Sequence, residues 1–298
     1  MVDAERLSGV HVALATPIEP SGELDRAGLR GLLDRVLDGG IFGICPTGST
    51  GEGPRLTRAQ RREVLRAVRE HVGDEPLVVP APSGLTSHDV IDELEEFSGL
   101  GADAALIAVP SYFPMAEPDV LRYYQAVADS AAIPFLIYNI PPMTGVSVPP
   151  WVVGELASHP KVVGIKDSSR DFEYFEEVVY ATAGSENFAV LTGSDTMLLA
   201  SMVVGGDGTI AASANFVPEL GVGVYSNVQK EDWPEAHRLQ RRLFEVVRTC
   251  RAGVPPGGWK AALEHAGVCS RRLVPPADPL SDAQYTQLVR RLVELGYS

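Results

Sequence analysis

The sequence predicts an α/β fold, a (β/α)8 barrel with a C-terminal helical extension. Short apolar runs alternate with stretches of helical period, eight such pairs follow one another, and together they occupy residues 9–228 of 298. Strands that alternate with helices form parallel sheets, and eight pairs on this length suit a closed barrel. A doubly wound sheet would have fewer pairs and a glycine-rich turn after its first strand, where this chain has "ATPI".

The eight predicted strands are the short apolar runs. They lie within residues 9–18, 40–50, 76–83, 103–113, 134–142, 162–169, 188–195 and 208–215. The helices between them repeat apolar side chains at every third or fourth position. They lie within residues 25–40, 57–73, 87–101, 118–131, 149–159, 171–184, 196–206 and 217–228.

After residue 229 the alternation stops and only helical patterns follow. They cover residues 234–253, 258–267 and 281–296, with proline-rich joints at "VPPGG" and "VPPADP". We therefore expect a catalytic barrel domain over residues 1–229 and a helical extension over residues 230–298.

Charge and cysteine content exclude several classes of function. The net charge is −14, from 25 basic and 39 acidic residues, which argues against a nucleic-acid partner and against anionic membrane surfaces. The N-terminus "MVDAERLSGV" resembles no signal or transit peptide, and no apolar run is long enough to span a membrane. Three widely spaced cysteines indicate neither a disulfide framework nor a zinc site, so we expect a cytoplasmic protein.

The carboxyl ends of barrel strands are where catalytic groups are found, so they locate the candidate site. They supply Lys166, Tyr138, Tyr112, several hydroxyl groups and the glycine-rich stretch "GSTGEG". We find no His, no Cys and no pair of carboxylates there, which excludes a Ser–His–Asp triad and glycoside cleavage by paired acids. What remains is a lysine nucleophile with phenolic acid–base groups.

Lys166 closes the apolar run "VVGIKDSS", where an unpaired charge is costly. Burial favours the neutral form of an amine, and a neutral amine attacks ketones to form a Schiff base. The alternation of side chains along a strand places Val162, Gly164 and Lys166 on one face, so Lys166 is expected to point inward. A solvated strand-end lysine is the alternative, and Gly164 and the neighbouring tyrosines argue against it.

The other candidates each have a structural alternative. In "GSTGEG" the amides of Ser49 and Thr50 suit a carboxylate, but a plain glycine-rich loop has the same composition. Tyr138 suits both an acid–base group and a core tyrosine with a satisfied hydroxyl. Tyr112 equally suits an exposed aromatic at an interface.

Four blocks identify a resemblance to a known family: "GSTGE", "YNIPPMTG", "GIKDSS" and "TGSDTMLLASMVVGGDGTIAASANFVPEL", in this order. They resemble the pyruvate-dependent class I aldolases, the superfamily of dihydrodipicolinate synthase and N-acetylneuraminate lyase, and the likeness covers essentially the whole chain. The resemblance implies a lyase that needs no cofactor and no metal. It also implies pyruvate and an aldehyde as substrates, and a homodimer or homotetramer.

The resemblance assigns roles to the matching positions. Lys166 would form the Schiff base, Tyr138 would be the general acid–base group, and Thr50 and Tyr112 would extend a proton relay from Tyr138. The family residue that matches Tyr112 reaches into a neighbouring subunit's site. The substrate-binding residues would be Ser49 and Thr50 for the carboxylate, Ile210 through its backbone, and Gly193, Ser168 and Asp195, although Asp195 also suits a helix cap.

Met143 decides which aldehyde we expect. Dihydrodipicolinate synthases usually carry Arg there, in a motif "YNxPxRTG", to bind the carboxylate of their aldehyde, and a thioether cannot replace a guanidinium. The motifs look more like those of the 2-keto-3-deoxy-sugar-acid aldolases, so we expect a polyhydroxylated or otherwise uncharged aldehyde. The alternatives are a dihydrodipicolinate (4-hydroxy-tetrahydrodipicolinate) synthase, a keto-deoxy-acid dehydratase or decarboxylase of the same family, and a non-catalytic metabolite-binding barrel.

Overall fold

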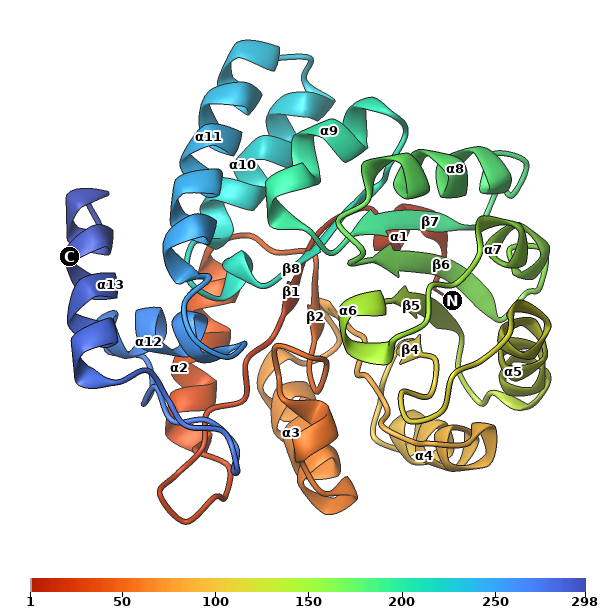
Figure 1. Cartoon of the computed structure of the whole chain (residues 1–298), viewed down its shortest axis with the longest axis horizontal. Helices are drawn as coiled ribbons and strands as arrows, with labels where there is room; N and C mark the ends of the chain where they lie inside the picture. The colour runs from red at the N-terminus through yellow and green to blue at the C-terminus, as the bar shows by residue number, and fades with distance from the viewer. Residues whose placement is uncertain (1) are drawn as a thin grey trace.

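The computed structural model describes residues 2–298 as a barrel of eight parallel strands followed by three helices (Figure 1). The order of hydrogen-bonded neighbours is β3-β2-β1-β8-β7-β6-β5-β4. The strands are β1 Gly9–Ala13, β2 Gly43–Cys45, β3 Leu77–Val78, β4 Ala105–Ala108, β5 Phe135–Asn139, β6 Val162–Asp167, β7 Ala189–Thr192 and β8 Gly208–Ala211. The predicted fold class is confirmed.

Backbone hydrogen bonds between the β3 and β4 segments close the sheet into a barrel. The amide of Asp103 donates to the carbonyl of Val78 at 3.0 Å, and the amide of Leu106 donates to that of Pro80 at 2.9 Å. Closure leaves no open sheet edge, so the carboxyl ends of all eight strands form one ring.

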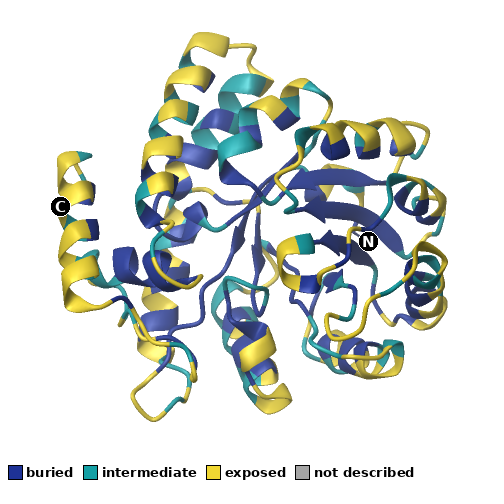
Figure 2. Cartoon of the chain, in the orientation of Figure 1, coloured by how far each residue is buried: buried dark blue, intermediate teal, exposed yellow. Residues whose placement is uncertain are grey.

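Helices surround this ring and bury their apolar faces against it, as Figure 2 shows by the dark strands within a paler shell. In α3, for example, Val64, Leu65 and Val68 are buried, and a capping box of Thr57 and Gln60 fixes the first turn. The barrel helices are α1 Ala4–Leu7, α2 Arg26–Asp38, α3 Arg58–Val72, α4 Ser87–Gly99, α5 Glu117–Ser130, α6 Pro141–Thr144, α7 Pro150–Leu156, α8 Phe172–Thr182, α9 Leu198–Val203 and α10 Pro218–Gln229. Short 3₁₀ turns lie at Gly53–Arg55, Asp195–Met197 and Ser213–Asn215.

Strand β6 does not keep the simple alternation expected for it. Its pairing with β5 shifts register, from Phe135 opposite Val162 to Leu136 opposite Gly164. Val163 therefore packs inside the barrel, whereas Val162 packs among the residues outside it. The prediction that Val162 shares a face with Lys166 was wrong, because it did not allow for this irregularity.

The helices after residue 229 pack against the barrel on the side of β8. They are α11 Trp233–Cys250, α12 Gly257–His265 and α13 Asp282–Glu294, and Figure 1 shows α13 at the outer edge. Their apolar faces form one buried cluster with Phe216, Val217 and Leu220 of the barrel. The proposed boundary at residue 229 falls between α10 and α11, and the division into two domains stays a prediction. Within residues 2–298, no helix combines the length and the apolar character that crossing a membrane requires.

Candidate active site

Lys166 lies on β6 at the carboxyl end of the barrel and is only 5 % exposed. The strand register sets it opposite Tyr138 of β5, and its Nζ lies 4.6 Å from the centre of the Tyr138 ring. Among the described residues, no carboxylate forms a salt bridge with Lys166. The amine is therefore buried against an aromatic ring without a counter-charge, which suits a nucleophile better than a structural cation.

The hydroxyl of Tyr138 reaches toward the loop after β2. It lies 3.4 Å from Oγ of Ser49, at the outer limit of a hydrogen bond. The side chain of Thr50 makes no such contact within residues 2–298. The residue that the structure brings to Tyr138 is thus Ser49, and the place of Thr50 in the relay stays a prediction.

Gly193 follows β7 and packs directly against the lysine side chain. A Cβ added there would lie 2.9 Å from Cε of Lys166 and 2.0 Å from Oγ of Ser168. The amide of Gly193 donates to the carbonyl of Asp167 at 2.5 Å, which fixes this approach. Gly193 therefore packs closely against both Lys166 and Ser168, and the predicted contacts of Gly193 and Ser168 with substrate stay predictions.

The next residues on β5 and β6 point to the other side of the strands and lock the pair together. Nδ2 of Asn139 donates to Asp167 Oδ1 at 2.8 Å, and Oγ of Ser169 donates to Asp167 Oδ2 at 2.9 Å. Burial raises the pKa of Asp167, and these hydrogen bonds oppose that rise. The cross-link holds Tyr138 and Lys166 in register on the inner face.

The loop after β2 forms a tight turn with unusual backbone angles. Thr47 and Glu52 have φ angles of 59° and 55°, a region that costs residues with a side chain roughly 1–3 kcal/mol each. Within the turn, the amide of Glu52 donates to the carbonyl of Ser49 at 3.2 Å and that of Gly53 to the carbonyl of Gly48 at 3.0 Å. Such strain persists only where the surroundings hold the backbone in place.

The remaining predicted residues have different positions. Ile210 lies on β8 and is 2 % exposed, in the barrel interior. Asp195 is buried, and it accepts hydrogen bonds from the amide of Ser213 at 2.9 Å and from the hydroxyl of the same residue. Asp195 therefore joins the loops after β7 and β8, and its proposed contact with substrate stays a prediction.

Tyr112 does not join the other residues within one chain. It is 75 % exposed and packs edge-on against Phe113, with ring centres 4.9 Å apart. Met143 is also exposed, on the short helix α6 that follows β5.

Sequence reasoning missed a cysteine at the site. Cys45 is the last residue of β2, so the statement that no Cys stands at a strand end was wrong. Burial raises the pKa of the Cys45 thiol to about 12, and the nearby charge of Lys166 opposes that rise. The thiol is therefore uncharged at neutral pH and behaves as a small apolar group beside the lysine. Its position directly before "PTGST" was the signal in the sequence.

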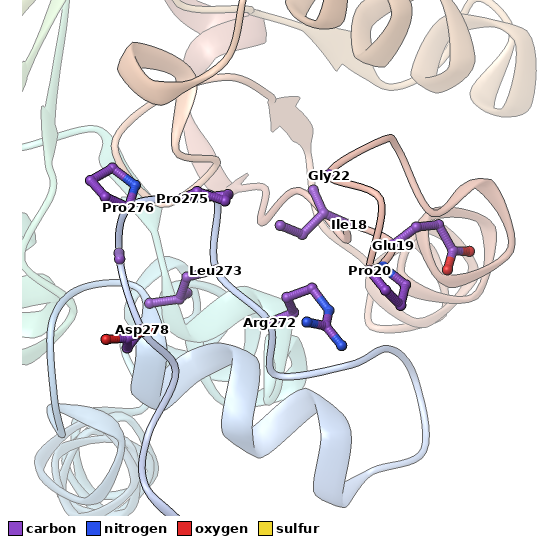
Figure 3. Close-up of a pocket in the computed structure, with 10 residues that line it drawn as sticks. Ile18, Glu19, Pro20, Gly22, Arg272, Leu273, Pro275, Pro276 and Asp278 are labelled. Carbon is purple, nitrogen blue, oxygen red and sulfur yellow. The ribbon is translucent and has the colours of Figure 1, made fainter.

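A surface cavity of about 200 Å³ lies elsewhere, between the loop after β1 and the segment after α12 (Figure 3). Arg272, Leu273 and Pro275 form one wall, and Ile18 and Glu19 form the other. None of these residues stands at the end of a strand near Lys166. Within residues 2–298, no group of three or more His, Cys, Asp or Glu side chains is arranged to hold a metal ion.

Comparison with known proteins finds relatives of one family over nearly the whole chain. The sequence model of the dihydrodipicolinate synthetase family matches residues 6–295. A curated 4-hydroxy-tetrahydrodipicolinate synthase from Phenylobacterium zucineum is 32% identical, covering 97% of both chains. One from Methanosarcina acetivorans is 31% identical, covering 97% of this chain and 98% of that protein.

Solved structures show the same likeness. The prophage protein YagE of E. coli K12, a member of the dihydrodipicolinic acid synthase family solved in complex with pyruvate, superposes with a TM-score of 0.93. The two sequences are 28% identical, and the match covers 98% of this chain and 99% of YagE. The dihydrodipicolinate synthase of Acinetobacter baumannii, also solved with pyruvate, gives a TM-score of 0.93 at 26% identity, covering 98% and 99% of the two chains. This chain therefore belongs to the dihydrodipicolinate synthetase family and is an enzyme of the pyruvate-dependent class I aldolase type.

Proposed function

We propose that this enzyme forms or cleaves a carbon–carbon bond next to pyruvate through a Schiff base on Lys166. The observation that carries this proposal is the pairing of Lys166 with Tyr138 across β5 and β6, which sets a buried amine without a carboxylate partner against a phenol. Pyruvate in the solved structures of relatives supports the choice of keto acid.

The reaction then follows from the two groups. Nζ of Lys166 attacks the keto carbon through its lone pair, Tyr138 donates the proton with which the oxygen leaves as water, and a protonated imine remains. Loss of a proton from the methyl carbon gives an enamine, whose carbon attacks the aldehyde; cleavage is the reverse. Tyr138 moves these protons, and Ser49 Oγ is the adjacent group that passes them on. The amides of Ser49 and Thr50 bind the carboxylate of the keto acid.

Two candidate functions differ in the aldehyde that reacts with pyruvate. Met143 offers no charge to a carboxylate, which favours an uncharged, polyhydroxylated aldehyde and hence a 2-keto-3-deoxy-sugar-acid aldolase. Ser168 Oγ, which lies against Gly193 beside the lysine, is the group we assign to the hydroxyls of that substrate.

The second candidate is 4-hydroxy-tetrahydrodipicolinate synthase. The curated relatives named above carry this activity in their names, and at 31–32% identity over nearly the whole chain they favour it over the first candidate. Met143 is the observation against it.

A panel of aldehydes separates the candidates. The enzyme is incubated with pyruvate and either a polyhydroxylated aldehyde or one that carries a carboxylate, and products are identified by mass spectrometry. The first candidate predicts turnover of the uncharged aldehyde and about tenfold better use of the carboxylate aldehyde after Met143→Arg. Efficient use of the carboxylate aldehyde by the unaltered enzyme establishes the second candidate. Loss of water from a keto-deoxy acid without a C–C break indicates a dehydratase instead.

We also propose that Tyr112 completes the site of a second copy of the chain. An aromatic pair that is about three-quarters exposed is unusual for a monomer surface, since Tyr112 and Phe113 are 75% and 74% accessible. Sedimentation of the enzyme and of Tyr112→Ser tests this; a monomeric enzyme with unaltered turnover in the variant would contradict it.

A further inference from the structure

The carboxylate of Glu52 connects the loop after β2 to the C-terminal helices. Glu52 is 2 % exposed, and its side chain leaves the loop three residues after Ser49. Oε2 accepts hydrogen bonds from the amide of Val274 at 2.9 Å and from Nη1 of Arg55 at 3.0 Å. Oε1 lies 2.7 Å from Nζ of Lys260 on α12. Two of these three partners, Val274 and Lys260, belong to the C-terminal extension, and Arg55 belongs to the loop itself.

Lys260 is the fully buried partner. Its side chain is 0 % exposed, and its Nζ also donates to the carbonyl of Arg272 at 2.7 Å. Burial lowers the pKa of Lys260, while the charge of Glu52 opposes this. The pair thus gathers three separate pieces of chain around one carboxylate: the loop after β2, helix α12 and the segment from Arg272 to Val274. That segment is the one that forms a wall of the cavity in Figure 3.

Glu52 is also one of the two residues of this turn that have a positive φ angle. Glu52 holds a φ of 55° while its amide donates to the carbonyl of Ser49. The other end of the turn is fixed at Thr47, whose carbonyl would lie 1.6 Å from a Cβ on Gly53. A strained turn of this kind keeps its shape only if its ends are held. Glu52 is held by Arg55 within the loop and, from outside the barrel, by Lys260 and the amide of Val274.

We propose that Glu52 and Lys260 are positioning residues for the keto-acid site. The C-terminal extension, through this buried pair, sets the backbone of Ser49 and Thr50 so that their amides meet the substrate carboxylate. This inference rests on the proposed function, because it assumes that pyruvate binds at these amides. Neither residue touches the substrate, and their effect is on its affinity.

The test measures how the trapping of pyruvate depends on its concentration. Intact enzyme is treated with pyruvate and borohydride, which reduces the imine to a stable amine, and the modified fraction is read by mass spectrometry. We compare the unaltered enzyme with Glu52→Gln, Lys260→Met and the double variant, which removes both charges and keeps the volumes similar. We expect the half-saturating pyruvate concentration to rise about tenfold, with the maximal modified fraction retained.

Two controls separate positioning from general destabilisation. Lys230→Met removes an exposed lysine, and Leu292→Ala opens a hole in the buried cluster of the extension while leaving both charges of the pair in place. Leu292→Ala is expected to lower the melting temperature and leave the half-saturating concentration unchanged. A folded double variant whose half-saturating concentration stays within about twofold of the unaltered enzyme overturns the proposal. So does failure of all three variants to fold, because the pair would then support the whole chain. If the unaltered enzyme is not modified at all, the proposed function itself fails.

Discussion

Two buried lysines of this chain have opposite surroundings. Lys166, 5 % exposed at the carboxyl end of β6, faces the ring of Tyr138 and a glycine that leaves space around its side chain. Lys260, fully buried on α12, lies 2.7 Å from both a carboxylate and a carbonyl oxygen. A paired ammonium in a closed site gives structure, whereas an amine that is buried without a carboxylate partner and beside a phenol is free to react. Burial alone does not make a nucleophile.

The largest expected effect is at the reactive lysine. Lys166→Ala removes the amine that forms the imine, so turnover should fall by a factor on the order of 10⁴ or more. Because Lys166 has no ion pair among the described residues, the variant should keep its fold. Steady-state assays and circular dichroism check both parts, and a variant with ordinary turnover would support a non-catalytic barrel.

The structural lysine should show the reverse pattern in stability. Lys260→Met leaves the buried Glu52 carboxylate with Arg55 as its one remaining cationic partner in the described part of the chain, which should lower the free energy of unfolding by up to about 3–5 kcal/mol. The double variant Glu52→Gln/Lys260→Met should recover much of that loss, since neither charge remains. Denaturant titrations measure this recovery. If the double variant instead loses the sum of the stability losses of the two single variants, Glu52 and Lys260 do not act as a pair.

A third buried basic group, His11, should make the stability of the fold depend on pH. His11 on β1 is buried, its Nε2 lies 2.7 Å from the carbonyl of Leu7, and burial lowers its pKa to about 4. The unfolded chain takes up this proton near pH 6.5 and the folded chain does not, so stability should fall as pH drops from 6.5 to 4, by about 3 kcal/mol in total. Unfolding titrations of the enzyme and of His11→Gln isolate this slope; equal slopes would show that His11 does not carry it.

The space around Lys166 can be tested by closing it. Gly193→Ala places a Cβ 2.9 Å from Cε of Lys166 and 2.0 Å from Oγ of Ser168, so one of them must move. We expect turnover to fall by about 10², since small displacements of reacting groups are costly. Gly184→Ala, where nothing lies within 4 Å of the added Cβ, is the matched control. Full activity in Gly193→Ala would show that the lysine tolerates displacement.

The barrel itself was predictable, because eight repeats of a strand and a helix leave few other folds. The lysine at the end of β6 was predictable for the same reason that makes it reactive: a charge that ends an apolar run needs an explanation. The irregular pairing at Val163 was not predictable. Val162 and Val163 are both apolar, so the sequence pattern fits either of them pointing into the barrel.

The second lysine was overlooked although its signal was similar. Lys260 lies in "GWKAALEHAG", in which residues 258–263 are all buried, and the helical period drew attention away from the charge. Its partner Glu52 is more than 200 positions earlier in the sequence, and only the folded chain brings them together. The contact between Tyr138 and Ser49 was likewise beyond the sequence, because the choice between Ser49 and Thr50 depends on the shape of the turn.

We expect Lys166, and not another lysine, to carry the imine. The chain has four lysines, at positions 161, 166, 230 and 260, so the site can be mapped directly. The enzyme is treated with pyruvate and borohydride and digested, and the modified peptide is sequenced by mass spectrometry. We expect one pyruvate-dependent adduct, on Lys166 in "VVGIKDSS". An adduct on Lys260, or none that depends on pyruvate, would contradict it.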